Sequence, residues 1–107
     1  MPRRSPERRK AISMSEARAH LVVSGRVQGV FFRHQTQQTA SGLGLKGMVR
    51  NRMDGSVELI AEGDRKKIER LISWCWQGPD LARVDNVEID WQEPTGEYYA
   101  FKVERTV

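Results

Sequence analysis

The sequence predicts one α+β domain in which two helices cover one face of a β-sheet. Three observations predict this fold class. Several short segments alternate apolar and polar residues, two longer segments repeat apolar residues at helical spacing, and the two kinds of segment alternate along the chain. The length of 107 residues suits a single compact domain.

The first half of the chain predicts a strand, a helix and a second extended segment. Residues 19–23 form a short β-rich run that ends at Ser24. The following segment has the spacing of one helix face, with Phe32, Thr36, Thr39, Ala40 and Leu43 on that face. Two nearby glycines are expected to end this helix. Residues 47–51 are then expected to be extended.

The next segments predict a hairpin turn and a third strand. Residues 53–55 read Met-Asp-Gly, and the Asp-Gly pair tolerates the positive φ angles that a tight hairpin turn needs. Val57, Leu59 and Ala61 then alternate with more polar neighbours, which is the pattern of a half-buried strand.

The last third of the chain predicts a second helix and two strands. Asp64 is expected to be the N-cap of a helix that Gly78 and Pro79 end. Its buried face is expected to consist of Ile68, Leu71, Ile72 and Cys75. Alternating residues then predict strands over 87–91 and 99–103. This order of elements gives a ferredoxin-like βαββαβ sandwich with a mixed, mostly antiparallel sheet, both helices on one face and an extra C-terminal edge strand.

Composition excludes several classes of protein. No apolar run approaches the roughly 20 residues that a membrane-spanning helix needs, so we expect no membrane partner. The single cysteine, Cys75, excludes an internal disulfide and an all-cysteine metal cage, which favours a reducing, cytoplasmic compartment. Neither the carboxylates nor the two histidines have a recognisable metal-ligand spacing, so no metal is expected.

The formal net charge of +4 comes from the N-terminus. Residues 1–18 carry six Lys or Arg and two Asp or Glu, whereas residues 19–107 carry twelve of each. We therefore interpret residues 1–17 as a flexible basic extension and residues 18–107 as the folded domain. The extension is either an arm for anionic surfaces or a solvated tail. The neutral domain gives no electrostatic case for a nucleic-acid partner.

The informative segment links the first strand to the first helix. Two glycines four residues apart allow a sharp turn with inward-pointing N–H groups, and the helix N-terminus adds unsatisfied donors and a partial positive charge. Such a loop is a nest for a phosphate-sized anion. The loop consists of Gly25, Arg26, Val27, Gln28, Gly29, Val30, Phe31 and Phe32.

Two polar side chains accompany this loop. Arg33 falls in the first turn of the helix and can offer a bidentate fork to the same anion. Asn51 ends the second strand, which is expected near the first strand, so its amide is expected to face the loop. We expect Gln28 to be structural within the loop. His34 is expected to be exposed and to point about 100° away from Arg33 around the helix.

These residues resemble the acylphosphatase family, small ferredoxin-like enzymes that hydrolyse carboxyl-phosphate anhydrides. The resemblance covers roughly residues 19–103. Its matching positions are 23–30, Phe32, Arg33, Ala40, Gly42, Leu43, Gly47, Val49, Asn51, Asp54, Gly55, Gly78, Pro79, 82–84, 94–96 and Phe101. Met48 departs from the pattern, because many members have an aromatic residue there.

The resemblance implies an enzyme that hydrolyses acyl phosphates to a carboxylate and inorganic phosphate. It assigns phosphate binding to the loop Gly25–Phe32 and to Arg33, and water positioning to Asn51. It implies an acyl phosphate as substrate, inorganic phosphate as product or inhibitor, and no cofactor. Nothing in the pattern requires more than a monomer.

Two alternatives from other classes remain open at this point. The first is a catalytically silent module of the same fold that binds an anion for regulation or partner contact. The second is an RNA-binding ferredoxin-like domain, which would stack bases on aromatic side chains of the central strands. The third predicted strand offers no aromatic residue for such stacking.

Overall fold

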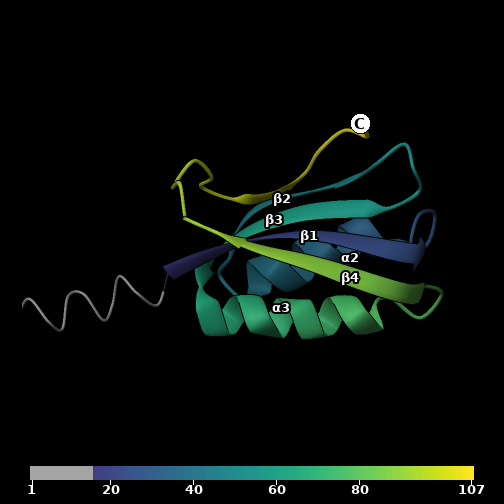
Figure 1. The fold of residues 1–107 in the computed structure, drawn as a ribbon, viewed down its shortest axis with the longest axis horizontal. Coiled ribbons are helices and arrows are strands. Elements are labelled where there is room, and N and C mark those ends of the chain that lie inside the picture. Colours follow the sequence, from purple (N-terminus) through teal and green to yellow (C-terminus); the bar gives the residue numbers. More distant parts are fainter. Residues whose placement is uncertain (1–15) are drawn as a thin grey trace, which may run out of the picture.

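The computed structural model describes residues 16–107, so the prediction of a flexible extension lies outside the described residues except at its last two positions. The elements are β1 (Glu16–Arg26), α2 (Phe32–Gly42), β2 (Lys46–Asn51), β3 (Val57–Asp64), α3 (Arg65–Gln77), β4 (Arg83–Gln92) and β5 (Phe101–Val103). Every predicted element is present (Figure 1). β1 is longer than predicted at both ends.

The sheet has the strand order β4-β1-β3-β2-β5. β1 pairs antiparallel with β3 and β4, and β2 pairs antiparallel with β3 but parallel with β5. The ferredoxin-like arrangement with an additional edge strand is therefore confirmed. β3 lies between β1 and β2, so β2, the strand that carries Asn51, does not pair with β1. Direct strand pairing therefore does not explain how Asn51 comes near the β1–α2 loop.

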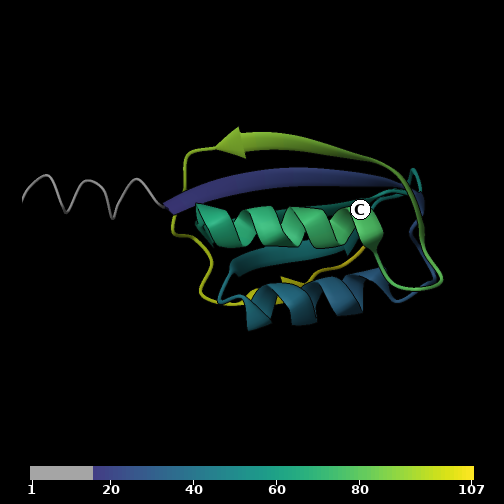
Figure 2. The same ribbon diagram turned by 90° about the horizontal axis from the view of Figure 1, so that it is seen from below.

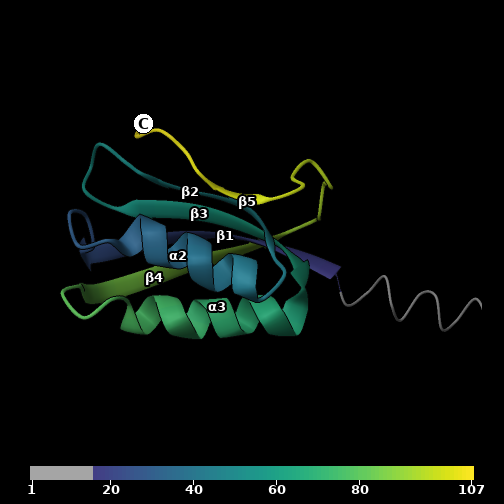
Figure 3. The same cartoon turned by 180° about the vertical axis from the view of Figure 1, so that it is seen from behind.

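Both helices lie on the same face of the sheet, as seen from below in Figure 2 and from behind in Figure 3. The core between these layers is formed by alternating strand residues and by one stripe of each helix. Its largest fully buried apolar side chains include Leu21, Val23, Phe32, Val49, Val57, Leu59, Ile68 and Leu71. Each buried Leu, Ile or Phe of this kind stabilises the fold by roughly 1.5–3 kcal/mol.

The predicted face of α3 is largely confirmed. Ile68, Leu71 and Cys75 are fully buried and Ile72 packs partly against them. Burial raises the pKa of the Cys75 thiol to about 12, so this side chain behaves as a small apolar residue. Asp64 is at the N-cap position as predicted, although its side chain makes no capping hydrogen bond.

Neither helix in the described part of the chain is long and apolar enough to cross a membrane.

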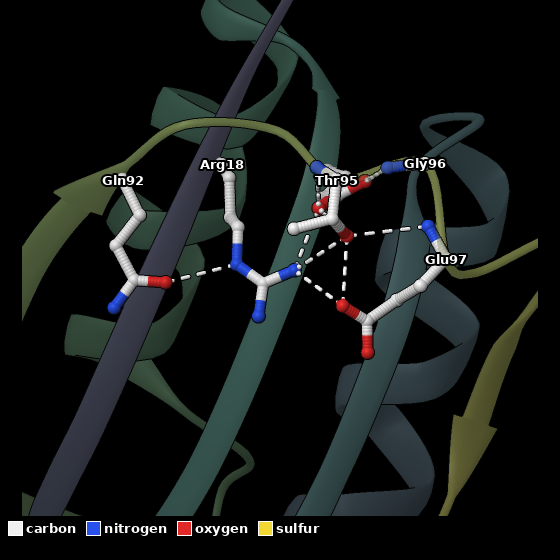
Figure 4. A network of polar contacts seen from close by, with 6 residues as sticks. Arg18, Gln92, Thr95, Gly96 and Glu97 are labelled. Atoms are coloured by element: carbon white, nitrogen blue, oxygen red, sulfur yellow. Dashed lines mark hydrogen bonds and ion pairs between the residues drawn. The ribbon is translucent and has the colours of Figure 1, made fainter.

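A polar network fixes the connection from β4 to β5 across the sheet (Figure 4). The buried Glu62 carboxylate accepts hydrogen bonds from Arg18 Nη1 at 2.7 Å, from the Thr95 N–H at 2.8 Å and from the Gly96 N–H at 3.0 Å. Arg18 also donates to Gln92 and Glu97. The network directs the chain from one sheet edge to the other, where β5 pairs with the strand that carries Asn51.

Candidate active site

A cavity of about 390 Å³ lies where the β1–α2 loop, the start of α2 and the end of β2 meet. Figures 1 and 3 both show the β1–α2 loop and the β2–β3 turn at the same end of the sheet. The lining residues are Val27, Gly29, Phe31, Phe32, Arg33, His34, Asn51 and Val103. The cavity therefore brings Arg33 and Asn51 together, as the sequence predicts.

The backbone of the loop presents hydrogen-bond donors without protein partners. Within the described residues 16–107, no backbone N–H group of residues 28–34 donates a hydrogen bond to a protein oxygen. The N-cap of α2 is Phe31, whose side chain cannot cap the helix. Because the first N–H groups of a helix need acceptors, this segment is suited to bind an anion.

Two left-handed residues produce this loop conformation. Gly29 has φ 76°, which glycine adopts without steric cost, and a Cβ added there would meet no atom within 4 Å. Phe31 has φ 66°, and among the described residues it is the one residue other than glycine with a positive φ. Such backbone strain, of order 1–3 kcal/mol, is concentrated at functional sites.

Four residues of the predicted phosphate loop do not line the cavity. Gly25 and Arg26 belong to the end of β1 and pair with β4. Val30 is buried in the core. Gln28 donates from its amide to the carbonyl oxygens of Arg52 and Ser56, each at 2.8 Å, which agrees with the structural role expected for it.

Gly25 allows β1 and β4 to approach each other closely. A Cβ at this position would lie 2.2 Å from the carbonyl oxygen of Arg83 and 2.8 Å from the Asp85 nitrogen. The sequence predicts a turn into the loop at this glycine, but β1 continues one residue beyond it. The close approach of β4, which local sequence does not reveal, is the physical reason for glycine here.

Asn51 has an unpartnered polar atom at the cavity. Its Oδ1 atom is buried and, within the described chain, has no hydrogen-bond partner. The backbone of Asn51 is held by pairing with Val57 of β3 and by the Val107 N–H, which donates to the Asn51 carbonyl oxygen at 3.1 Å. An amide oxygen without a protein donor keeps its capacity to accept a hydrogen bond, and Asn51 is a lining residue of the cavity.

The electrostatic character of the cavity is positive. Arg33 is half-buried and forms no ion pair with any other residue of the 16–107 segment. No lining residue is a carboxylate. A cation that no carboxylate neutralises, beside free backbone donors, favours an anionic ligand.

Sequence reasoning missed two lining residues. His34 is exposed as expected, and it lines the same cavity as Arg33. The sequence predicts Val103 only as a residue of the last strand. The parallel pairing of β5 with β2 brings it to the cavity wall. No local signal identifies Val103, because its position depends on which strand β5 joins.

Comparison with known proteins gives consistent results. A family model described as acylphosphatase matches residues 19–103. The chain is 57% identical over 90 residues to an acylphosphatase of Pelotomaculum thermopropionicum, covering 84% of this chain and 98% of that relative.

Solved structures show the same fold. An acylphosphatase from Coxiella burnetii superposes with a TM-score of 0.80 at 42% identity, covering 85% of this chain and 95% of that one. Full-length HypF, solved in a phosphate- and nucleotide-bound form, matches with a TM-score of 0.77 at 30% identity, and this match covers 85% of this chain but 12% of HypF.

Proposed function

The chain belongs to the acylphosphatase family. We propose that Arg33 and the β1–α2 loop bind the phosphoryl group of an acyl phosphate. We propose further that Asn51 positions the attacking water. The observation that carries the proposal is the shared cavity. Within residues 16–107 it combines an Arg33 without an ion pair, an Asn51 Oδ1 atom without a hydrogen-bond partner and a run of free backbone N–H groups.

The chemistry of the substrate explains why so few side chains suffice. The leaving group is a carboxylate whose conjugate acid has a pKa of about 4, so it departs without a proton from the protein. The remaining task is to hold a doubly charged phosphoryl group and to place a water in line with the bond that breaks. Positioning and electrostatic stabilisation are the main contributions of enzymes to phosphoryl transfer.

The loop and Arg33 take the first of these tasks. The free N–H groups of residues 28–34 and the guanidinium of Arg33 supply donors for the peripheral phosphoryl oxygens. These donors are fixed before the substrate arrives, because the backbone of the loop is set by Gly29, Phe31 and the Gln28 hydrogen bonds. Preorganised donors of this kind stabilise charge that develops in the transition state.

Asn51 takes the second task. Its amide oxygen accepts a hydrogen bond from the water, but a neutral amide cannot remove the water's proton near pH 7. Among the residues that the structure describes, no carboxylate lines the cavity to act as a base. In the proposed mechanism the water oxygen attacks phosphorus, the bond to the carboxylate oxygen breaks, and a phosphoryl oxygen receives the water's proton.

Benzoyl phosphate hydrolysis by Arg33→Ala and Asn51→Ala tests these assignments. We expect Arg33→Ala to raise KM and to lower kcat by roughly 100-fold or more, because a charge contact in the transition state is lost. We expect Asn51→Ala to lower kcat by a similar factor of about 100, with little change in competitive inhibition by inorganic phosphate.

Arg70→Ala and Asn86→Ala are matched controls, since both residues are exposed and neither lines the cavity. They are expected to hydrolyse benzoyl phosphate like the wild type. An Asn51→Ala protein that keeps most of the wild-type kcat would contradict the role of Asn51 in positioning water.

A further inference from the structure

Phe31 has a side chain that the packing of the fold does not explain. Its side chain is 69% exposed, although a phenylalanine gains most of its stabilisation from burial. Its backbone is in the left-handed region, with φ 66°. The fold therefore retains both a strained backbone and an exposed aromatic ring immediately before Phe32 and Arg33. A local cost of this kind points to a role in ligand binding.

The cavity beside Phe31 is larger than a phosphoryl group, and its lining has both polar and apolar residues. Arg33, His34 and Asn51 contribute its polar groups. Four lining residues are apolar, but Val27 and Phe32 are each only 1% exposed. The two most exposed apolar residues of the lining are thus Phe31, at 69% exposure, and Val103, at 41%. Phe31 also borders a second hollow, together with Trp74.

We propose that Phe31 and Val103 form the contact surface for the acyl group of the substrate and favour apolar, aromatic acyl groups. The inference rests on the proposed function, because it requires the phosphoryl group to be held by Arg33 and the loop. With the phosphoryl group held there, the acyl group must leave the polar part of the cavity. The exposed apolar side chains of the same cavity are then its neighbours.

The ring of Phe31 suits this contact physically. An aromatic ring pair adds about 0.5–1.5 kcal/mol beyond the burial of apolar area, which corresponds to roughly a 2- to 10-fold change in an equilibrium or rate ratio. Val103 comes from β5 and Phe31 from the β1–α2 loop, so two elements far apart in the chain line the same cavity. No lining carboxylate opposes a carboxylate leaving group.

The test compares kcat/KM for benzoyl phosphate and acetyl phosphate in the wild type and in three variants. Phe31→Asn removes the ring and keeps a residue that tolerates the left-handed region. Val103→Thr keeps the shape of Val103 but adds a polar hydroxyl group. Tyr99→Ala is the control, since Tyr99 is 83% exposed and does not line this cavity.

We expect the benzoyl-to-acetyl ratio of kcat/KM to fall roughly 3- to 10-fold in Phe31→Asn and about 2-fold in Val103→Thr. Tyr99→Ala is expected to keep the wild-type ratio. A general weakening of the phosphate-binding loop lowers both kcat/KM values together and cancels in the ratio. The same cancellation removes the different intrinsic reactivities of the two substrates.

An unchanged ratio in both Phe31→Asn and Val103→Thr would overturn the assignment of the acyl surface. So would equal losses for both substrates in Phe31→Asn, because that result places Phe31 in phosphate binding alone. Failure of the proposed function gives a different result. In that case Arg33→Ala hydrolyses acetyl phosphate as fast as the wild type, whatever the ratio shows.

Discussion

At the scale of single residues, two chemically similar amide side chains near the cavity have different roles. The Gln28 amide donates to two backbone carbonyl oxygens and thereby ties the loop to the β2–β3 turn. The Asn51 amide oxygen is also buried but has no partner within the described residues. A satisfied amide is structural, whereas an unsatisfied one at a cavity wall is available to a ligand.

In the described part of the chain, His34 is the one ionisable residue besides Arg33 that lines the cavity, so it is the alternative acceptor for the water's proton. Under the proposed mechanism the phosphoryl group takes that proton, and the imidazole transfers no proton in the reaction. We therefore expect His34→Gln to keep the shape of the wild-type dependence of kcat on pH. Benzoyl phosphate hydrolysis measured from about pH 5 to about pH 9 tests this.

The opposite result is also clear. If one limb of the wild-type pH–rate profile disappears in His34→Gln, the imidazole transfers a proton in the reaction. The proton acceptor in the proposed mechanism would then be His34 and not the substrate.

At the scale of elements, β5 connects the polar network on the sheet to the active site. It pairs with β2 from Gly47 to Val49, and the chain beyond it continues along the same strand. The Glu104 N–H donates to the Val49 carbonyl oxygen at 2.8 Å, and the Val107 N–H reaches the Asn51 carbonyl oxygen at 3.1 Å. The backbone position of Asn51 therefore depends on an edge strand that Glu62 and Arg18 help to place.

We expect Glu62→Ala to lower the free energy of unfolding by about 3 kcal/mol, because it breaks a buried ion pair and leaves the Thr95 and Gly96 N–H groups without their acceptor. Urea unfolding measures this change. The control is Glu88→Ala on β4, whose exposed carboxylate makes no hydrogen bond or ion pair with the rest of residues 16–107.

Hydrogen exchange locates the effect within the fold. In Glu62→Ala the Glu104 amide, which pairs with β2, is expected to exchange faster than in the wild type. Wild-type protection of this amide in a destabilised Glu62→Ala protein would show that the network stabilises the fold without placing β5.

At the scale of the whole molecule, two carboxylates on the open face of the sheet link stability to pH. Burial by itself raises the pKa of Glu58 and of Glu62, but their hydrogen bonds to cations and N–H groups outweigh it and lower both values. Glu58 is held by His20 at 2.6 Å and Arg50 at 2.8 Å. A carboxylate with a lowered folded-state pKa stabilises the protein while it is ionised.

The sign follows from proton binding. The unfolded chain binds more protons than the folded protein between the lowered folded-state pKa values and the ordinary value of about 4.5. The stabilisation is present above that ordinary value and is lost as the pH falls through the folded-state values. We expect the free energy of unfolding to decrease from about pH 5 to about pH 3, measured by urea titration at several pH values.

The double variant Glu58→Gln/Glu62→Gln is the comparison for this acid loss. It is expected to be less stable than the wild type at pH 7 and to lose less stability between pH 5 and pH 3, since two of the titrating groups are absent. Equal acid losses in the wild type and the double variant would place the titrating groups elsewhere.

The sequence by itself determined the features that depend on neighbouring residues. Alternation predicted β3, helical spacing predicted the buried face of α3, and the Asp-Gly pair predicted the turn before Val57. The place of the loop between β1 and α2 and of Arg33 in the first turn of α2 was also predictable, because a strand end, two glycines and a helix start follow one another in the chain. These signals are local, so they are visible without knowing what packs against them.

Only the tertiary structure decided the features that depend on segments far apart in the chain. Glu62 accepts hydrogen bonds from Thr95 and Gly96, Gly25 is required by the approach of β4, and Val103 reaches the cavity through the pairing of β5 with β2. The physical reason is that strand order and close approach arise from long-range packing, which a residue's own neighbours do not record. The sequence therefore determined the loop between β1 and α2, and the packing determined the walls of the cavity beside it.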